Sequence, residues 1–154
     1  MQKDQIKEIQ MIKINDYSVK IKNEINSIIT KYLSEHKEIN SVGIYSCPWS
    51  GWISLCFNKN KTINDSGSNC PDFEFVEYGM IQIPEWEKEY NSEKIEIKEN
   101  ALKTFRPDLE KEGDDAFNKI FFDYLKKIAK EELTLKYKDK ILIQMLDSKY
   151  LEII

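Results

Sequence analysis

The sequence has few of the residues from which recognisable sites are usually built. Its 5 glycines are too dispersed to form a glycine-rich phosphate loop or a G-x-G-x-x-G motif. Its 3 cysteines, Cys47, Cys56 and Cys70, are odd in number and form no C-x-x-C pair, so neither a disulfide framework nor a zinc site is favoured. The sequence therefore predicts no cofactor, no metal site and no recognisable catalytic motif.

The chain has 1 histidine, His36, so only one imidazole is available to act as a general base. His36 lies near the end of a predicted helix, where an imidazolium would interact favourably with the carbonyl end of the helix dipole, and we interpret it as structural. A Cys–His catalytic pair with one of the three cysteines has no local signature here, and a cysteine is commonly a small buried hydrophobic residue. A small hydrolase that uses such a pair, or carboxylates, is therefore the alternative to a binding protein.

Long apolar runs and an excess of basic residues are also missing. No uncharged apolar stretch approaches the roughly 20 residues that span a bilayer, and residues 1–8 carry scattered charges where a secretory signal has an apolar core. The formal net charge of -4 opposes nucleic-acid binding, because phosphate neutralisation needs clustered Lys and Arg. These features predict a soluble cytoplasmic protein without a nucleic-acid or membrane partner. Abundant Ile, Asn and Lys, with one arginine, suggest an AT-rich bacterial genome.

What the sequence does contain is enough apolar residues for a folded core. With 41% hydrophobic and 32% charged residues, the chain of 154 residues has the size and composition of one domain, which we predict to span residues 1–154. Residues 1–15 are predicted to be frayed or to form a separate helical turn. The polar residues 58–71 are predicted to be a mobile surface loop that buries almost nothing.

Two stretches have the periodicity of amphipathic helices. Between residues 19 and 33, apolar side chains recur at three- and four-residue steps, and Asp16 or Ser18 is the predicted cap. Between residues 117 and 128, aromatic and aliphatic side chains form a continuous apolar face that follows a predicted cap at Asp114. We expect both helices to anchor the core.

The remaining elements are predicted to be mostly β-strands. Residues 42–45 and 52–57 are short β-rich runs joined by a turn with Pro and Gly, which predicts a hairpin. Residues 73–78 fit a third strand, and Met80, Ile81 and Ile83 either continue it or bend toward the next element. Residues 141–146, apolar on both faces, fit a covered strand that is central in the sheet. Residues 93–105 fit either a strand or a helix. The prediction is an α+β fold with a mainly antiparallel sheet packed against two longer amphipathic helices.

Acidic residues alternate with large aromatic side chains in residues 72–78 and 84–90, where a short helix is predicted to begin at Pro84. Aromatic anchors dominate interface hot spots, while carboxylates steer a basic partner. The competing interpretation places several of these rings in the core. The residues that we predict to contact a partner are Trp49, Trp52, Asp72, Glu74, Glu77, Glu85, Trp86, Glu87 and Tyr90.

The hairpin around Trp49 and Trp52 is followed by this aromatic and acidic texture at residues 70–78, 84–86 and 114–117. This order of parts resembles small bacterial immunity proteins of polymorphic toxin systems. The resemblance implies a stoichiometric inhibitor, a monomer or homodimer, that binds a cognate and basic toxin in the cytosol without catalysis. It lies in texture and not in a motif with fixed chemistry, so it transfers no binding residue. A homodimeric regulatory or scaffold subunit is a further alternative.

Overall fold

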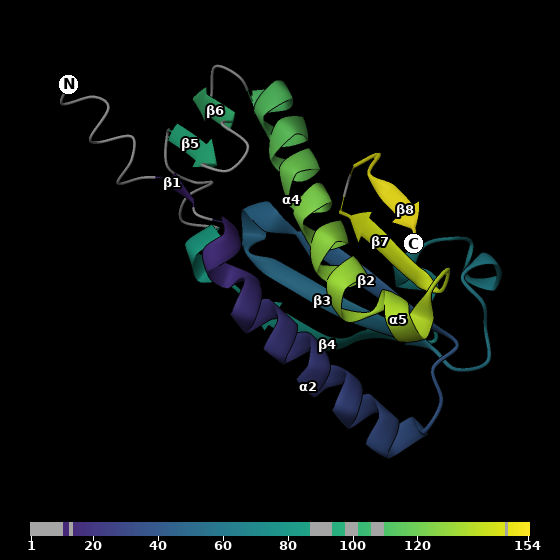
Figure 1. Cartoon of the computed structure of the whole chain (residues 1–154). Helices are drawn as coiled ribbons and strands as arrows, with labels where there is room; N and C mark the ends of the chain where they lie inside the picture. Colours follow the sequence, from purple (N-terminus) through teal and green to yellow (C-terminus); the bar gives the residue numbers. More distant parts are fainter. Residues whose placement is uncertain (1–10, 13, 87–93, 98–101, 106–109, 147) are drawn as a thin grey trace.

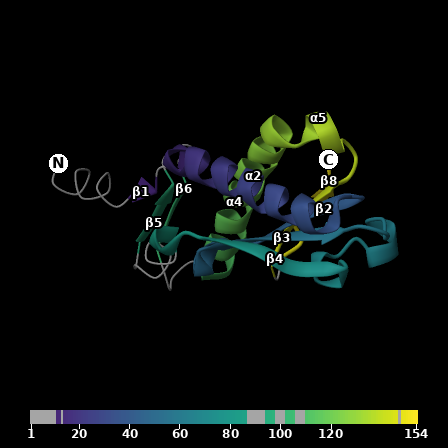
Figure 2. The same cartoon turned by 90° about the horizontal axis from the view of Figure 1, so that it is seen from below.

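A five-stranded sheet with helices on one face is the main feature of the computed structural model of this chain (Figures 1 and 2). The structure describes residues 11–12, 14–86, 94–97, 102–105, 110–146 and 148–154. The strands of the sheet are β2 (Ser41–Cys47), β3 (Trp52–Asn58), β4 (Phe75–Gln82), β7 (Ile141–Met145) and β8 (Leu151–Ile153). Their order is β4-β3-β2-β7-β8, and every neighbouring pair is antiparallel except β2 and β7.

Two long helices, α2 (Ser18–His36) and α4 (Glu110–Glu132), lie against the same face of this sheet, followed by the short α5 (Thr134–Tyr137) (Figure 2). The α+β prediction, with a mainly antiparallel sheet packed against two longer amphipathic helices, is thereby confirmed. In the described part of the chain, no helix combines the length and the apolar character needed to cross a membrane.

A second, smaller sheet resolves the ambiguous region of the sequence. It has the order β1-β5-β6 and consists of β1 (Met11–Ile12), β5 (Lys94–Ile97) and β6 (Leu102–Phe105). Within residues 93–105 the described segments are therefore strands, and β6 contacts α4. Of the helical turn predicted for residues 1–15, residues 11–12 are instead a strand, and a 3-10 turn, η1 (Ile14–Tyr17), leads into α2. Residues 1–10 lie outside the described residues.

The core lies between the large sheet and the two helices. The buried side chains of α2 are Ile21, Ile25, Ile29 and Tyr32, which recur at three- and four-residue steps as the sequence predicts. Burying each large apolar side chain contributes about 1.5–3 kcal/mol to folding. The helix approaches β4 so closely that a β-carbon at Gly79 would lie 2.6 Å from Ile28 Cγ2, so this strand position requires glycine or a displaced Ile28.

An aromatic cluster ties the last turn of α2 to the sheet. The Tyr32 ring stacks on Phe57 with centroids 4.2 Å apart and meets Phe75 and Tyr78 edge-on at 5.5 Å and 5.2 Å. His36 lies at the end of α2, as predicted. The centroid of its ring is 4.4 Å from that of Phe75. Aromatic pairs of this kind contribute about 0.5–1.5 kcal/mol beyond the apolar area that they bury.

Several predicted boundaries are wrong. The N-cap of α2 is Tyr17 and makes no side-chain cap bond, while the Ser18 hydroxyl shares a hydrogen bond with that of Tyr124 at 2.8 Å. Helix α4 begins at Glu110, so Asp114 lies inside it and does not cap it; a glycine inside a helix costs only about 1 kcal/mol, so Gly113 does not fix the start. Strand β7 is interior but not central, because β2 holds the middle position.

Two substitutions at Tyr32 distinguish the contribution of its ring packing to stability from that of its hydroxyl group. Its hydroxyl is buried and has no hydrogen-bond partner within the described structure. Tyr32→Ala should lower the free energy of unfolding by about 3–5 kcal/mol, because it empties the centre of the aromatic cluster. Tyr32→Phe should leave this free energy unchanged or raise it by about 1 kcal/mol, because it removes an unsatisfied polar group. Denaturant unfolding measures both, and a large loss for Tyr32→Phe would contradict the assignment.

Candidate functional site

The sheet face opposite the helices is the part of the described fold that no helix covers (Figure 2). One row of side chains crosses all five strands on this face, because paired residues in a sheet point the same way. The register places these residues in the order Met80, Ser54, Tyr45, Gln144 and Leu151. We use the term open face for the residues of this row and the next that reach the surface, which are Tyr45, Trp52, Met80, Gln82, Gln144 and Leu151.

Apolar and aromatic side chains dominate the open face. Met80 is 37% exposed and Leu151 is 42% exposed, and they lie on the two edge strands. Between them the half-buried rings of Tyr45 and Trp52 meet edge-on with centroids 5.7 Å apart. Exposed apolar groups that are contiguous across a sheet are typical of interaction surfaces, whereas single exposed ones are common everywhere.

A loop covers the adjoining part of the same face. This covering loop, residues 59–74, contains two 3-10 turns, η3 (Asn64–Ser66) and η4 (Cys70–Asp72). The prediction that residues 58–71 bury almost nothing is wrong, because Ile63 and Cys70 pack with Phe73 onto the sheet. Their partners on the sheet are Cys56 and Leu142. The few apolar residues of a polar stretch were the signal for this packing.

The buried side chain of Asn58 holds the start of the covering loop. Its Nδ2 lies 3.1 Å from Ser41 Oγ, 3.0 Å from Ser66 Oγ and 3.3 Å from the Thr62 carbonyl oxygen. Its Oδ1 accepts a hydrogen bond of 2.9 Å from the Glu74 backbone N–H. Sequence reasoning missed this residue, since an asparagine at the end of a strand also suits an ordinary turn.

Two further polar side chains fix the ends of the covering loop. The Glu74 carboxylate accepts backbone hydrogen bonds from Asn60 at 2.7 Å and Lys61 at 2.5 Å. Desolvation acts to raise the pKa of Glu74, but these backbone bonds hold the pKa below its usual value. On the other side, Gln144 accepts from the Cys70 N–H at 2.7 Å and donates to Asn69 Oδ1 at 2.8 Å.

The structure distributes the predicted contact residues over several environments. Trp52 lies on the open face, and three predicted carboxylates, Asp72, Glu77 and Glu85, are exposed. Glu74 is engaged with the loop backbone. Trp86 is fully buried, with its ring 4.3 Å from that of Phe121, so its prediction as a contact residue is corrected. The Trp49 side chain, Glu87 and Tyr90 lie outside the described residues.

The geometry does not assemble the alternative Cys–His site. The His36 ring packs among the rings of the aromatic cluster on the helix side of the sheet. Cys56 and Cys70 lie in the cluster on the opposite side, and Cys47 is paired with Trp52 of the open face. The sheet therefore separates the imidazole from all three thiols. Among the placed residues, no group of three His, Cys, Asp or Glu side chains is arranged to hold a metal ion.

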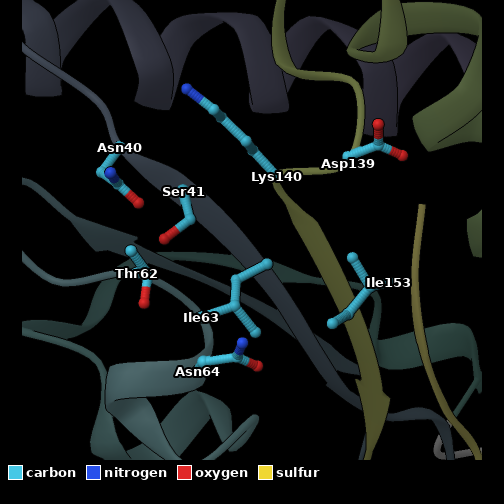
Figure 3. A pocket seen from close by; sticks show the side chains of 8 residues that line it. All are labelled: Asn40, Ser41, Thr62, Ile63, Asn64, Asp139, Lys140 and Ile153. Carbon is cyan, nitrogen blue, oxygen red and sulfur yellow. The ribbon is translucent and has the colours of Figure 1, made fainter.

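A pocket of about 250 Å³ lies where β2 and β7 begin and β8 ends (Figure 3). Its lining residues are Asn40, Ser41, Thr62, Ile63, Asn64, Asp139, Lys140 and Ile153. The two charged side chains, Asp139 and Lys140, extend in different directions in Figure 3 and do not converge on one point. A hydrolytic site requires a nucleophile or activated water within reach of a base, and this pocket does not present that arrangement.

Asn58 should be required for the covering loop to stay folded on the sheet. Asn58→Ala should lower the free energy of unfolding by about 1–3 kcal/mol, because it leaves buried partners without a hydrogen bond. It should also speed proteolytic cleavage within residues 59–74. Asn64→Ala is the matched control, since Asn64 is an exposed residue of the same loop. Equal cleavage rates for the two variants in limited proteolysis would contradict this role.

Comparison with known proteins supplies no relative: no family model matches the sequence, and neither a curated protein nor a solved structure matches it. We therefore infer a function from the geometry of the open face and from the exposed charges of this protein.

Proposed function

We propose that this protein is a stoichiometric inhibitor, an immunity protein, that binds a basic bacterial toxin domain through the open face. The observation that carries the proposal is the row of side chains that runs from Met80 to Leu151 on a sheet face without a helix. Occupying such a surface blocks a partner by steric exclusion. It requires no reaction on the part of the inhibitor.

The open face has the composition of an interface centre. Tyr45 and Trp52 are aromatic anchors on two adjacent strands, β2 and β3, in the interior of the sheet. Trp and Tyr are enriched among the residues that dominate binding energy. Their backbone is fixed by pairing on both sides, so little conformational entropy is lost when a partner binds. Met80 adds a flexible thioether that adapts to the partner's shape.

Three exposed carboxylates on the covering loop, on β4 and after β4 favour a basic partner. Asp72 lies in η4 of the covering loop, Glu77 lies on β4, and Glu85 follows that strand. All three are exposed, and the chain as a whole carries a formal charge of -4. Carboxylates at the rim of an apolar surface raise the association rate of a basic partner and fix its register.

The partner to test is the polypeptide encoded next to this chain. Expressed alone it should arrest bacterial growth, and co-expression of this protein should restore growth through a complex with equal numbers of each chain. Met80→Glu and Leu151→Glu should each weaken the complex about tenfold or more, because each places a charge among the apolar residues of the open face. Isothermal titration calorimetry measures the affinity and the stoichiometry.

Leu135→Glu is the matched control, because Leu135 is 97% exposed on α5, on the helix side of the sheet (Figure 2). It introduces the same charge outside the open face and should bind like the wild type. A harmless or unbound neighbour, or an equal loss for Leu135→Glu, would contradict the proposal. A concentration-dependent dimer in light scattering that Met80→Glu abolishes would assign the open face to a second copy of this chain instead.

A further inference from the structure

Two thiols that are distant in the sequence meet beneath the covering loop. Cys56 on β3 and Cys70 in η4 are both 0% exposed and belong to one buried cluster. They share the space above Gly43, where a β-carbon would lie 2.8 Å from Cys70 Sγ and 3.3 Å from Cys56 Cβ. The absence of a side chain at this strand position is what allows the two cysteines to come together.

The contact between the two thiols gives them different pKa values. Cys70 donates a hydrogen bond to the Cys56 sulfur, and this bond, against the effect of burial, lowers the pKa of Cys56 to about 7. Burial raises the pKa of Cys70 well above its usual value. Since the thiolate is the nucleophilic form, Cys56 is the sulfur that reacts first and Cys70 is the one that follows.

We propose that Cys56 and Cys70 form a redox-active dithiol that hydrogen peroxide oxidises to an intramolecular disulfide. The Cys56 thiolate attacks a peroxide oxygen, so that an S–O bond forms, the O–O bond breaks and hydroxide leaves. The Cys70 sulfur then attacks Cys56, so that the S–S bond forms and the S–O bond breaks. The hydroxide released in the first step and the hydroxyl group released in the second each take up one thiol proton and leave as water. Two electrons pass from the thiols to the peroxide, and a thiol reductant reverses the reaction.

The fold makes the pairing specific. Cys47 is on the same strand as Gly43, four residues further on and therefore about 13 Å away, which is too far for a disulfide with either partner. Hydrogen peroxide is close to water in size, and a local opening of the covering loop is enough to admit it. The resulting bond would fasten η4 to β3. This inference does not depend on the proposed docking function.

The test uses the full chain, first reduced and then treated with hydrogen peroxide while native. After alkylation in denaturant, the intact mass should show the loss of two hydrogen atoms and one alkylated thiol. Peptide mapping should place the disulfide between Cys56 and Cys70 and the alkyl group on Cys47. Oxidation should also shift the denaturant midpoint upward, because the bond closes a loop in the unfolded chain. The reduced protein should return to the original midpoint.

Two variants test the roles of the individual cysteines. Cys47→Ser should form the disulfide as the wild type does and should keep no alkylatable thiol. Cys70→Ala should form no disulfide, and dimedone should trap its Cys56 as the sulfenic acid. The proposal is overturned if the native chain keeps three alkylatable thiols under conditions that fully oxidise free glutathione. It is equally overturned if the disulfide that forms includes Cys47. The wild-type mapping decides both points even if a variant does not fold.

Discussion

Side chains on β2 and β3 alternate between the two faces of the sheet, and the rest of the structure depends on how each face is covered. Ile44 and Ile53 point to the helices and are sealed in the core, whereas Tyr45 and Trp52 point the other way. On the second face the covering loop lies over the row of Cys56 and is hydrogen-bonded to Gln144 of the next row. The docking surface that we propose lies beside this loop.

Local sequence features made much of the fold predictable, but they did not predict which strands distant in the sequence pair with each other. The hairpin follows from Pro48, which begins a 3-10 turn, and from Gly51, which takes a left-handed conformation with φ of 70°. The spacing of apolar residues in α2 and in α4 likewise indicates one apolar face on each helix. The parallel pairing of β2 with β7 joins segments about a hundred residues apart. No property of either segment alone specifies that partner, so the central position of the sheet was assigned to the wrong strand.

The structure removes some of the predicted contact residues from the site for a related reason. Trp52 and Trp86 are both predicted to contact a partner, but Trp86 packs against Phe121 of α4 and is buried in the core. Glu74 and Glu77 also look alike in the sequence. Hydrogen bonds to the loop backbone engage Glu74, while Glu77 stays exposed with a φ of 51°. Burial and engagement are set by tertiary partners, which an isolated segment does not reveal.

Gln144 connects the two halves of the face opposite the helices. It belongs to the row that crosses the open face, and both atoms of its amide bind the covering loop, at Asn69 and at the Cys70 N–H. A partner that takes hydrogen bonds from Gln144 would compete with the loop, since the amide has few remaining donors and acceptors. Fixing Cys70 to β3 by a disulfide would hold the Cys70 N–H beside Gln144. If both proposals hold, Gln144 is the side chain through which the redox state of the dithiol would act on the docking surface.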